Sequence, residues 1–114
     1  MVEARRIPDD PLAFIQERVR RRQLFWTYHV NMRLKQRFIS RAAIIGAVDR
    51  YEVIEEYPQD KYLPSYLVFA RHGGEVFHIL FATDVGGDNV RVVTAYHPAT
   101  DEWSADLKTR RRSR

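Results

Sequence analysis

The feature that most constrains the fold is a change in the spacing of apolar residues near Glu52. From there on the chain contains four short runs rich in β-branched and aromatic residues, at 53–57, 66–71, 76–83 and 90–96. Such runs are typical of strands, and the segments between them carry the Gly, Pro, Asn and Asp of turns. Because a parallel crossover needs a dozen or more residues, these short connections predict an antiparallel meander of four strands.

Before Glu52 the apolar residues recur at helical spacing. This spacing predicts three helices, over about 11–23, 28–37 and 41–48. Each follows a residue that caps helix N-termini, namely Asp10, Thr27 and Ser40. The expected fold class is therefore α+β, with N-terminal helices packed on one face of a four-stranded antiparallel sheet.

A chain of 114 residues is expected to form one domain. We expect a basic N-terminal helical extension at 1–23, the α+β domain at 24–109 and an arginine-rich tail at 110–114. Within the domain, Leu24–Trp26 is either a brief strand or an apolar anchor into the core. The Thr100–Trp103 segment is expected to form a short helix or turn that leads into the tail.

The charge of the chain is divided along its length. Residues 1–41 carry a net charge of +6, residues 42–109 a net charge of −6, and the tail adds +4. This division fits a polyanion partner such as RNA, an acidic protein partner, or an oligomer in which the two regions meet between subunits. It is equally typical of ordinary solvated surface.

Several chemistries are excluded. The absence of Cys rules out disulfides, thiol catalysis and thiolate metal sites. There is no Gly-rich phosphate loop, no nucleophile elbow and no pair of His at metal-ligand spacing, so no metal or cofactor is expected. Because the chain has no secretory signal and no apolar stretch near the ~20 residues of a membrane span, we expect a cytoplasmic protein with no membrane partner.

One helix flank carries residues suited to phosphate chemistry. His29, Arg33 and Arg37 are spaced four residues apart, so they share one flank of the second helix. Arginine matches phosphate oxygens with a fixed fork, and histidine exchanges a proton near neutral pH. The alternative is a solvated flank whose arginines pair with carboxylates of the sheet such as Glu55 or Glu56.

A second candidate is His78, in the middle of an apolar strand. A lone His in such a place is usually a core residue bonded to a backbone or hydroxyl group. If its strand pairs with the last strand, Thr94 or Tyr96 lies within reach of the ring. The result is either a structural network or an acid–base site.

Several motifs recur together in a known order. They are His29-x-x-x-Arg33-x-x-x-Arg37-x-Ile39-Ser40, Val53–Tyr57, Pro64–Val68, His78-Ile79, Val93–Pro98 and Trp103. In this order they resemble a small bacterial domain-of-unknown-function family related to the RelE/ParE toxin superfamily. The resemblance covers about residues 24–110 and implies a compact antiparallel sheet packed by N-terminal helices. Residues 1–23 lie outside it, and Phe38 stands where the family often has Gly.

The resemblance also implies a function. Catalytic members of the superfamily cut RNA without a metal ion, so it implies a toxin-type, metal-independent endoribonuclease of RelE-like fold. In that reaction a ribose 2′-hydroxyl attacks its own phosphate, assisted by a base, cations and an acid. By resemblance, His29 is the base or acid, Arg33 and Arg37 are phosphate clamps, and His78 and Tyr96 are the second proton donor and its support. An acidic, antitoxin-like protein partner is implied as well.

RNA binding is expected to involve the first helix, the flank of the second and the tail. The residues are Arg20, Arg21, Arg22, Arg33, Arg37, Arg110, Arg111 and Arg112. The alternative function is a non-catalytic RNA- or protein-binding module of the same fold, because the superfamily also contains members with other targets.

Overall fold

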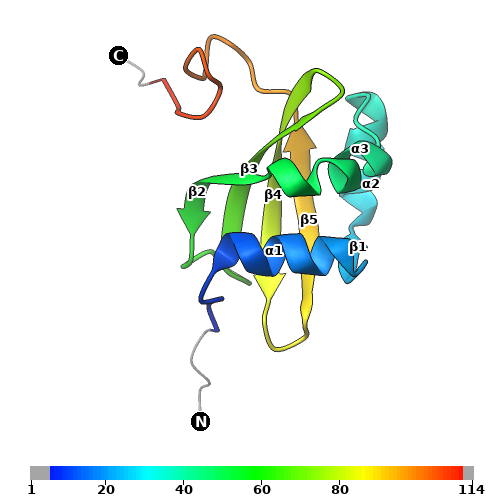
Figure 1. The fold of residues 1–114 in the computed structure, drawn as a ribbon, viewed down its shortest axis with the longest axis vertical. Coiled ribbons are helices and arrows are strands. Elements are labelled where there is room, and N and C mark those ends of the chain that lie inside the picture. Colours follow the sequence, from blue (N-terminus) through cyan, green and yellow to red (C-terminus); the bar gives the residue numbers. More distant parts are fainter. Residues whose placement is uncertain (1–5, 112–114) are drawn as a thin grey trace.

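Helices come first along the chain and the meander follows. A computed structural model describes residues 6–111. Its elements are α1 (Pro11–Arg20), β1 (Leu24–Trp26), α2 (Tyr28–Gln36), α3 (Arg41–Gly46), a 3₁₀ turn (Val48–Arg50), β2 (Glu52–Tyr57), β3 (Ser65–His72), β4 (Glu75–Asp84) and β5 (Asn89–Tyr96). Figure 1 shows α1 lying across the strands and α2 beside β5.

All three helices begin at the caps expected from the sequence. The Asp10 carboxylate accepts a hydrogen bond from the Ala13 amide, and the Thr27 and Ser40 hydroxyls accept from amides three residues further on. Each bond satisfies an amide that has no partner inside its own helix. These caps explain why helices form on either side of the short β1 rather than as one continuous helix.

The sheet of the described chain has five strands in the order β1-β5-β4-β3-β2. Strands β2 to β5 form the expected antiparallel meander. The expectation of a purely antiparallel four-stranded sheet is wrong, because β1 adds a fifth strand parallel to β5, with Leu24 opposite Val90. Loop lengths do not restrict this pairing, since the helices and the whole meander separate β1 from β5.

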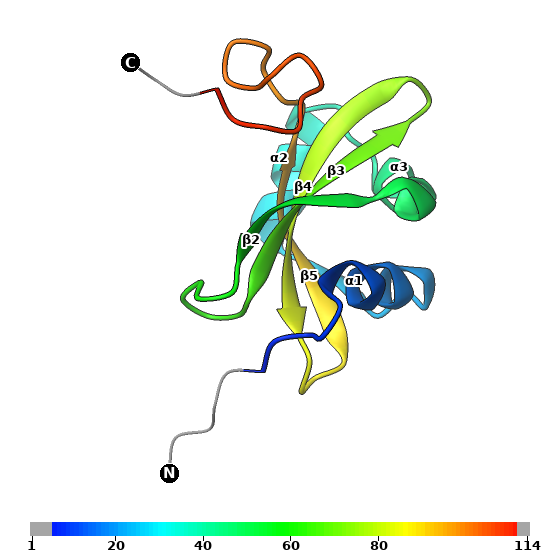
Figure 2. The same cartoon turned by 60° about the vertical axis from the view of Figure 1, so that its left-hand side comes forward.

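One side of the sheet, called the helix face, carries the main core. It includes Tyr66 and Val68 of β3, paired with Phe81 and Ile79 of β4, all buried. Helices α1 and α3 pack on this side, as Figure 2 shows. They add the fully buried side chains of Ile15, Val19 and Ile44 to the same core. Residues 11–20 therefore share the core of the domain.

The opposite side is called the open face and is formed by the alternate residues of the same strands. These are Ser65, Leu67 and Phe69 of β3 and His78, Leu80 and Ala82 of β4. The chain after β5, residues 97–111, folds over one end of this face and is called the C-terminal segment (Figure 2). Instead of a helix it forms turns, closed by a bridge between Trp103 and Arg110.

Helix α2 lies at the edge of the sheet, between the two faces. Strand β1 covers the first half of the outer edge of β5, and α2 packs against β5 as well. The buried residues of α2 are Val30 and Leu34, which join the core of the helix face. The adjacent flank of α2 points toward β5. Arg37, which follows the last residue of the helix on this flank, donates a hydrogen bond from Nη1 to the carbonyl of Ala95 (2.7 Å). The helix therefore presents one flank to the core and another to the open face.

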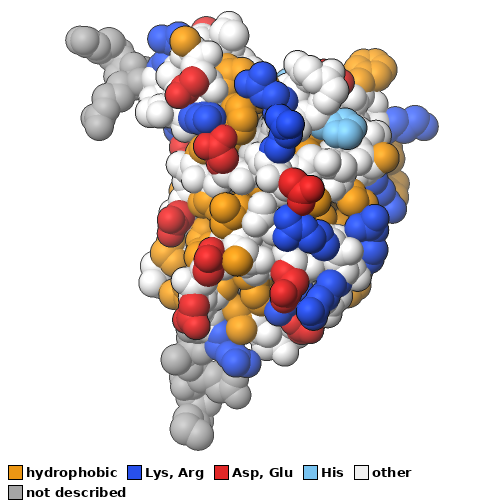
Figure 3. Space-filling view, in the orientation of Figure 1, with side chains coloured by type: hydrophobic (Ala, Val, Ile, Leu, Met, Phe, Trp, Pro, Cys, Tyr) orange, Lys and Arg blue, Asp and Glu red, His pale blue; other side chains and the backbone are white. Residues whose placement is uncertain are grey.

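On the helix face, cationic and anionic side chains lie interspersed rather than in separate fields (Figure 3). Arg20 pairs with Asp49 (2.6 Å) and Arg18 with Asp88 (2.6 Å), so α1 is tied to the acidic part of the chain. None of the helices within residues 6–111 is both long enough and apolar enough to span a bilayer.

Candidate nucleic-acid interface

A groove of about 340 Å³ crosses the open face. Its floor is the cross-strand pair Leu67 and Leu80, and Thr94 lies opposite Leu80 on β5. Around this apolar floor stand polar groups from β2, β5, the loop after β2 and the C-terminal segment: Glu55, Tyr57, Asp60, Thr94, Tyr96 and Arg110. An apolar floor with a polar rim is the usual form of a site for a flat, partly polar ligand.

One wall of the groove is a cluster of Glu55, Tyr57 and Arg110. The guanidinium of Arg110 donates to both carboxylate oxygens of Glu55, from Nε at 2.8 Å and from Nη2 at 3.2 Å, and the Tyr57 hydroxyl donates to the same carboxylate. The hydrogen bond to Glu55 raises the pKa of Arg110, while burial and the nearby carboxylate raise the pKa of Tyr57. Arg110, expected to bind phosphate, therefore has its charge balanced by Glu55.

Arg37 stands at the β5 side of the groove. Its Nη1 donates to the Ala95 carbonyl at 2.7 Å and makes a longer contact, 3.4 Å, with the Thr94 hydroxyl. Among the described residues neither Arg33 nor Arg37 pairs with Glu55 or Glu56, and Glu55 is paired with Arg110 instead. Arg37 thus fastens α2 to β5 and brings a positive charge beside the groove.

A second cleft adjoins the groove, and Asp60 lines both. This cleft has a volume of about 430 Å³, and His29 of α2 lines it together with Tyr62, Arg91 and Val93. The His29 side chain is exposed and touches only the edge of the Tyr28 ring among described residues, at 6.1 Å between centroids. The imidazole is therefore open to a ligand.

Arg33, one turn after His29, is exposed and has no ion pair or hydrogen bond with any residue in the range 6–111. No Asp or Glu occurs between Glu17 and Asp49, so a carboxylate partner could come only from a distant part of the chain, and none of the described carboxylates reaches Arg33. Lys35 is exposed without such a partner in the same range. The outer flank of α2 consequently carries positive charge that the described chain does not neutralise.

His78 and Tyr96 come together, in agreement with the contact expected from strand pairing. They are opposite each other in the register, and His78 Nδ1 lies 3.3 Å from the Tyr96 hydroxyl. His78 Nε2 lies 2.7 Å from the carbonyl of Leu107, which can only accept, so Nε2 carries the proton and Nδ1 accepts from Tyr96. The ring is fully buried, with Trp103 edge-on at 4.4 Å.

Burial fixes the protonation of this pair. It lowers the pKa of His78 and raises that of Tyr96, so the imidazole is neutral and the phenol keeps its proton. Only Tyr96 of the two lines the groove. His78 is therefore a buried support for the Tyr96 hydroxyl, whereas Tyr96 is the residue of the pair that lines the groove.

The remaining arginines expected to bind RNA lie elsewhere. Arg20 and Arg21 are on α1, which packs on the helix face, and Arg21 is 3.9 Å from Glu17. Arg22 donates to two carbonyls at the end of its own helix. Arg111 donates to the Thr100 carbonyl within the C-terminal segment. Arg112 lies outside the described residues, so the arginines expected to bind RNA do not form one surface.

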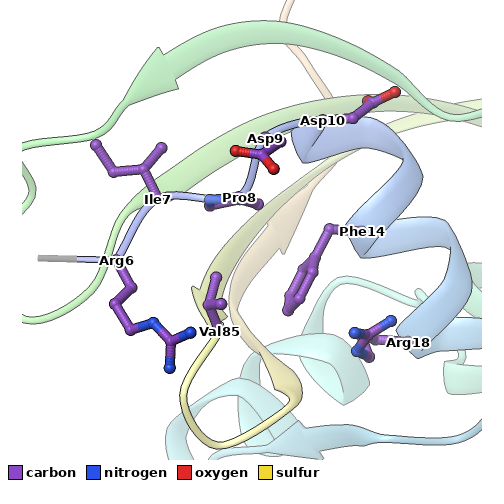
Figure 4. Close-up of a pocket in the computed structure, with 8 residues that line it drawn as sticks. All are labelled: Arg6, Ile7, Pro8, Asp9, Asp10, Phe14, Arg18 and Val85. Carbon is purple, nitrogen blue, oxygen red and sulfur yellow. The ribbon is translucent and has the colours of Figure 1, made fainter.

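The pocket in Figure 4 lies beside α1, on the helix side of the molecule and away from the groove. Its Phe14 ring points in between Val85 and Arg18, and the Arg18 guanidinium stacks on that ring at 4.2 Å. Arg18 is paired with Asp88, and Asp9 stands at the rim. Arg6 also lines this pocket and has no ion pair with any residue in the range 6–111, so Arg18 is the pocket arginine whose charge is balanced.

Glu55 and Tyr57 are groove residues that the sequence reading did not select as functional. Their signal is the strand period, because residues 55 and 57 of β2 share a face and oppose Leu67 and Ser65 of β3. The position of the C-terminal segment, which supplies Arg110, had no such signal. Among residues 6–111 no three His, Asp or Glu side chains gather closely enough to hold a metal ion.

A comparison with known protein families matches the central part of the chain. No curated protein and no solved structure matches it. A family match covers residues 26–97, which include α2, α3 and the meander with most of the groove, and leaves out α1 and the C-terminal segment. Since this match covers more than half of the chain, the protein belongs to the family described as "domain of unknown function (DUF4258)".

Proposed function

We propose that the protein is a toxin-type, metal-independent endoribonuclease of RelE-like fold that acts on RNA. One observation carries the proposal: groups able to move the protons of a phosphodiester line two adjoining clefts on the open face, and two cations lie beside them. His29 lines one cleft and Tyr96 the other. Arg37, at the end of α2, contacts Thr94 of the groove, and Arg33 follows His29 by one helical turn. The order of the motifs along the chain supports the relation to the RelE/ParE superfamily.

In the proposed reaction the 2′-hydroxyl of a ribose attacks the phosphate that links it to the next nucleotide. His29 removes the proton of that hydroxyl, because its imidazole is exposed and lines the cleft beside the groove. Arg33 and Arg37 stabilise the extra negative charge on the phosphorane. The products are a cyclic 2′,3′-phosphate and a free 5′-hydroxyl.

Tyr96 donates the proton to the leaving 5′-oxygen. Tyr96 lines the groove, and its phenol stays protonated because burial raises its pKa. His78 accepts a hydrogen bond from this hydroxyl in the resting state and, being neutral, takes its proton position from Leu107. His78 is accordingly a positioning residue for Tyr96 rather than a group that touches RNA.

The proposal includes cytoplasmic action and an acidic, antitoxin-like protein partner. Support for such a partner comes from the same flank of α2, where exposed cations alternate with Tyr28 and Met32, both exposed apolar side chains. An acidic protein that covered this flank would block access to His29 and Arg33.

The test is cleavage of an unstructured RNA of about twenty nucleotides in excess chelator. We expect His29→Ala to lower the rate at least 100-fold, since general acid–base catalysis contributes about 10²–10⁴. Tyr96→Phe is expected to lower it by a similar factor and Arg33→Ala by about tenfold. Arg21→Ala, an equal change of charge on the helix face, serves as the matched control and should leave the rate within about twofold of wild type.

Two results would remove the assignment. Equal cleavage by the wild type and all four variants means that the activity belongs to a contaminant. No cleavage by any of them, with all variants folded, means that the protein is not a ribonuclease on this substrate.

The second candidate is a non-catalytic RNA- or protein-binding module of the same fold. It is favoured by the burial of His78 under Trp103 and Leu107, because a buried imidazole cannot exchange protons with a substrate. RNA binding without product, steeply weakened by salt and unchanged by His29→Ala, would favour this candidate over the nuclease.

A further inference from the structure

Helix α2 ends in a left-handed turn of the Schellman type. The Ile39 amide donates back to the Leu34 carbonyl (3.0 Å) and the Phe38 amide to the Lys35 carbonyl (3.4 Å). Phe38 occupies the left-handed position of this turn, with φ of 57°. Glycine is the usual residue there because a side chain makes this conformation costly.

The Phe38 side chain gains nothing from the rest of the described chain. It is 89% exposed, the highest exposure of any large apolar residue in residues 6–111. Within that range its ring makes no aromatic or cation–π contact, and the buried contact that closes the turn is made by Leu34 and Ile39. A strained backbone that carries a fully exposed aromatic ring calls for a partner outside the chain.

The end of α1 provides the comparison. Arg22 has the same left-handed backbone, with φ of 62°, and its amide and the next one close the same type of turn. Its side chain, however, donates to the carbonyls of Val19 and Arg20 and so satisfies acceptors at the end of its own helix. Arg22 therefore has a local function in its turn and Phe38 has none.

The charge around Phe38 indicates the chemistry of the partner. Lys35 and Arg41 are exposed near it in the chain, Arg37 precedes it, and no acidic residue lies between Glu17 and Asp49. A cationic surface with a projecting aromatic ring is the arrangement that binds single-stranded nucleic acid, by contact with phosphates and by stacking on bases.

We propose that Phe38 stacks on an unpaired base of the RNA whose phosphates lie along the cationic flank of α2. This inference rests on the proposed function, of which it specifies one contact. Arg37, the neighbour of Phe38, reaches β5 beside the groove. A base stacked on Phe38 would therefore belong to a nucleotide adjacent to the part of the RNA that lies on the open face.

The experiment compares binding of two polyanions at one salt concentration. One is an unstructured RNA heptamer whose 2′-hydroxyls are methylated so that it cannot be cleaved, and the other is a linear inorganic polyphosphate of similar charge, which has no bases. Phe38→Gly is expected to weaken oligonucleotide binding about tenfold and leave polyphosphate binding within twofold of wild type. Phe38→Trp should restore the affinity, whereas Arg33→Ala should weaken binding of both polyanions.

Folding is measured alongside binding. Because glycine suits the left-handed position, Phe38→Gly should keep the melting temperature of the wild type or raise it by up to about 4 °C. The matched control is Arg22→Gly, the same backbone change at the end of α1, which should lower the melting temperature slightly and leave oligonucleotide binding within about twofold.

The outcomes separate this inference from the proposed function. Oligonucleotide binding by Phe38→Gly equal to wild type overturns the inference and leaves the function standing. Equal loss of affinity for both polyanions also overturns it, because the ring then acts through the fold and not by contact with a base. No binding of either polyanion by the wild type means that the proposed function itself has failed.

Discussion

Helices α1 and α2 are built alike but differ in what surrounds their charges. Both begin at a side-chain cap, both carry arginines, and both end in a left-handed turn at a residue other than glycine. On α1 the arginines meet carboxylates of Asp49, Asp88 and Glu17. On α2, Arg33 meets no carboxylate in the described chain. The comparison teaches that free surface charge is decided by tertiary contacts rather than by the number of arginines.

The same comparison shows where the basic and acidic regions of the sequence lie in the folded protein. The basic front and the acidic middle of the sequence meet within one molecule, through Arg20 and Asp49 and through Arg18 and Asp88. The described part of the arginine tail does the same, since Arg110 pairs with Glu55. An oligomer is therefore not needed to bring the two regions together, and the flank of α2 is one place in the described chain where cations have no carboxylate partner.

The largest expected effect tests whether α1 is an accessory helix. Ile15→Ala removes a fully buried side chain from the core under α1, and Leu34→Ala does so under α2. We expect each to lower the free energy of unfolding by about 3 kcal/mol. Urea denaturation measures both. A loss below about 1 kcal/mol for Ile15→Ala alone would mean that α1 rests on a finished domain instead of forming part of it.

An intermediate effect is expected on the stability of the protein at acidic pH. Burial lowers the pKa of His78, opposed by Leu107 and Glu55 and assisted by Arg110. Because the unfolded chain binds a proton near pH 6.5 that the folded chain resists, stability is present above that pH and falls as the pH drops below it. Thermal unfolding from pH 7.5 to 5 should show this fall in the wild type.

The matched variant is His78→Gln, whose amide keeps a donor for the Leu107 carbonyl but does not titrate. Its stability should change less over the same pH range, even if it is lower throughout. An identical pH dependence in the two proteins would assign the titration to another group. The effect bears on the comparison because His78 lies on the open face, opposite Tyr96 of β5, and not under α1.

A smaller effect compares the charges of the two helices directly. Arg33→Ala is expected to weaken binding of an unstructured RNA about five- to tenfold and to reduce its salt dependence by about one ion. Arg21→Ala should change the affinity less than twofold, because Glu17 lies beside it on the other face. Equal losses for both variants, measured by fluorescence anisotropy, would place RNA on both helices.

The smallest effect is expected for the ion pair between Arg20 of α1 and Asp49. Arg20 and Asp49 are both exposed at their 2.6 Å contact. A double-mutant cycle of Arg20→Ala and Asp49→Ala should give a coupling energy of about 0.5 kcal/mol, reduced by high salt. A coupling above about 2 kcal/mol would show that the pairing of α1 is a major source of stability, and not merely a neutralisation of charge.

The parts of the fold that depend on local chemistry could be predicted from the sequence. The caps at Asp10, Thr27 and Ser40 and the meander of β2 to β5 were of this kind, because capping and short turns act within a few residues. The parallel pairing of β1 could not, because three apolar residues pair with β5 only after the whole chain has folded.

The candidate site was predictable to the same degree. The approach of His78 to Tyr96 followed from antiparallel pairing of neighbouring strands. The seclusion of His78 did not, since it depends on a C-terminal segment whose position has no local signal. Helical spacing placed His29 and Arg33 on one flank, but only the packing of α2 at the sheet edge sets that flank beside the open face.

The central claim is that RNA lies on the flank of α2 and the open face, and not on α1. Titration of the 15N-labelled protein with a short unstructured RNA, followed by amide chemical shifts, tests it most directly. The account predicts that the largest changes fall on residues 29–38 and 94–96, with those of α1 small. The largest changes at Arg20–Arg22 of α1 and the turn that follows it, with residues 29–38 unaffected, would contradict it.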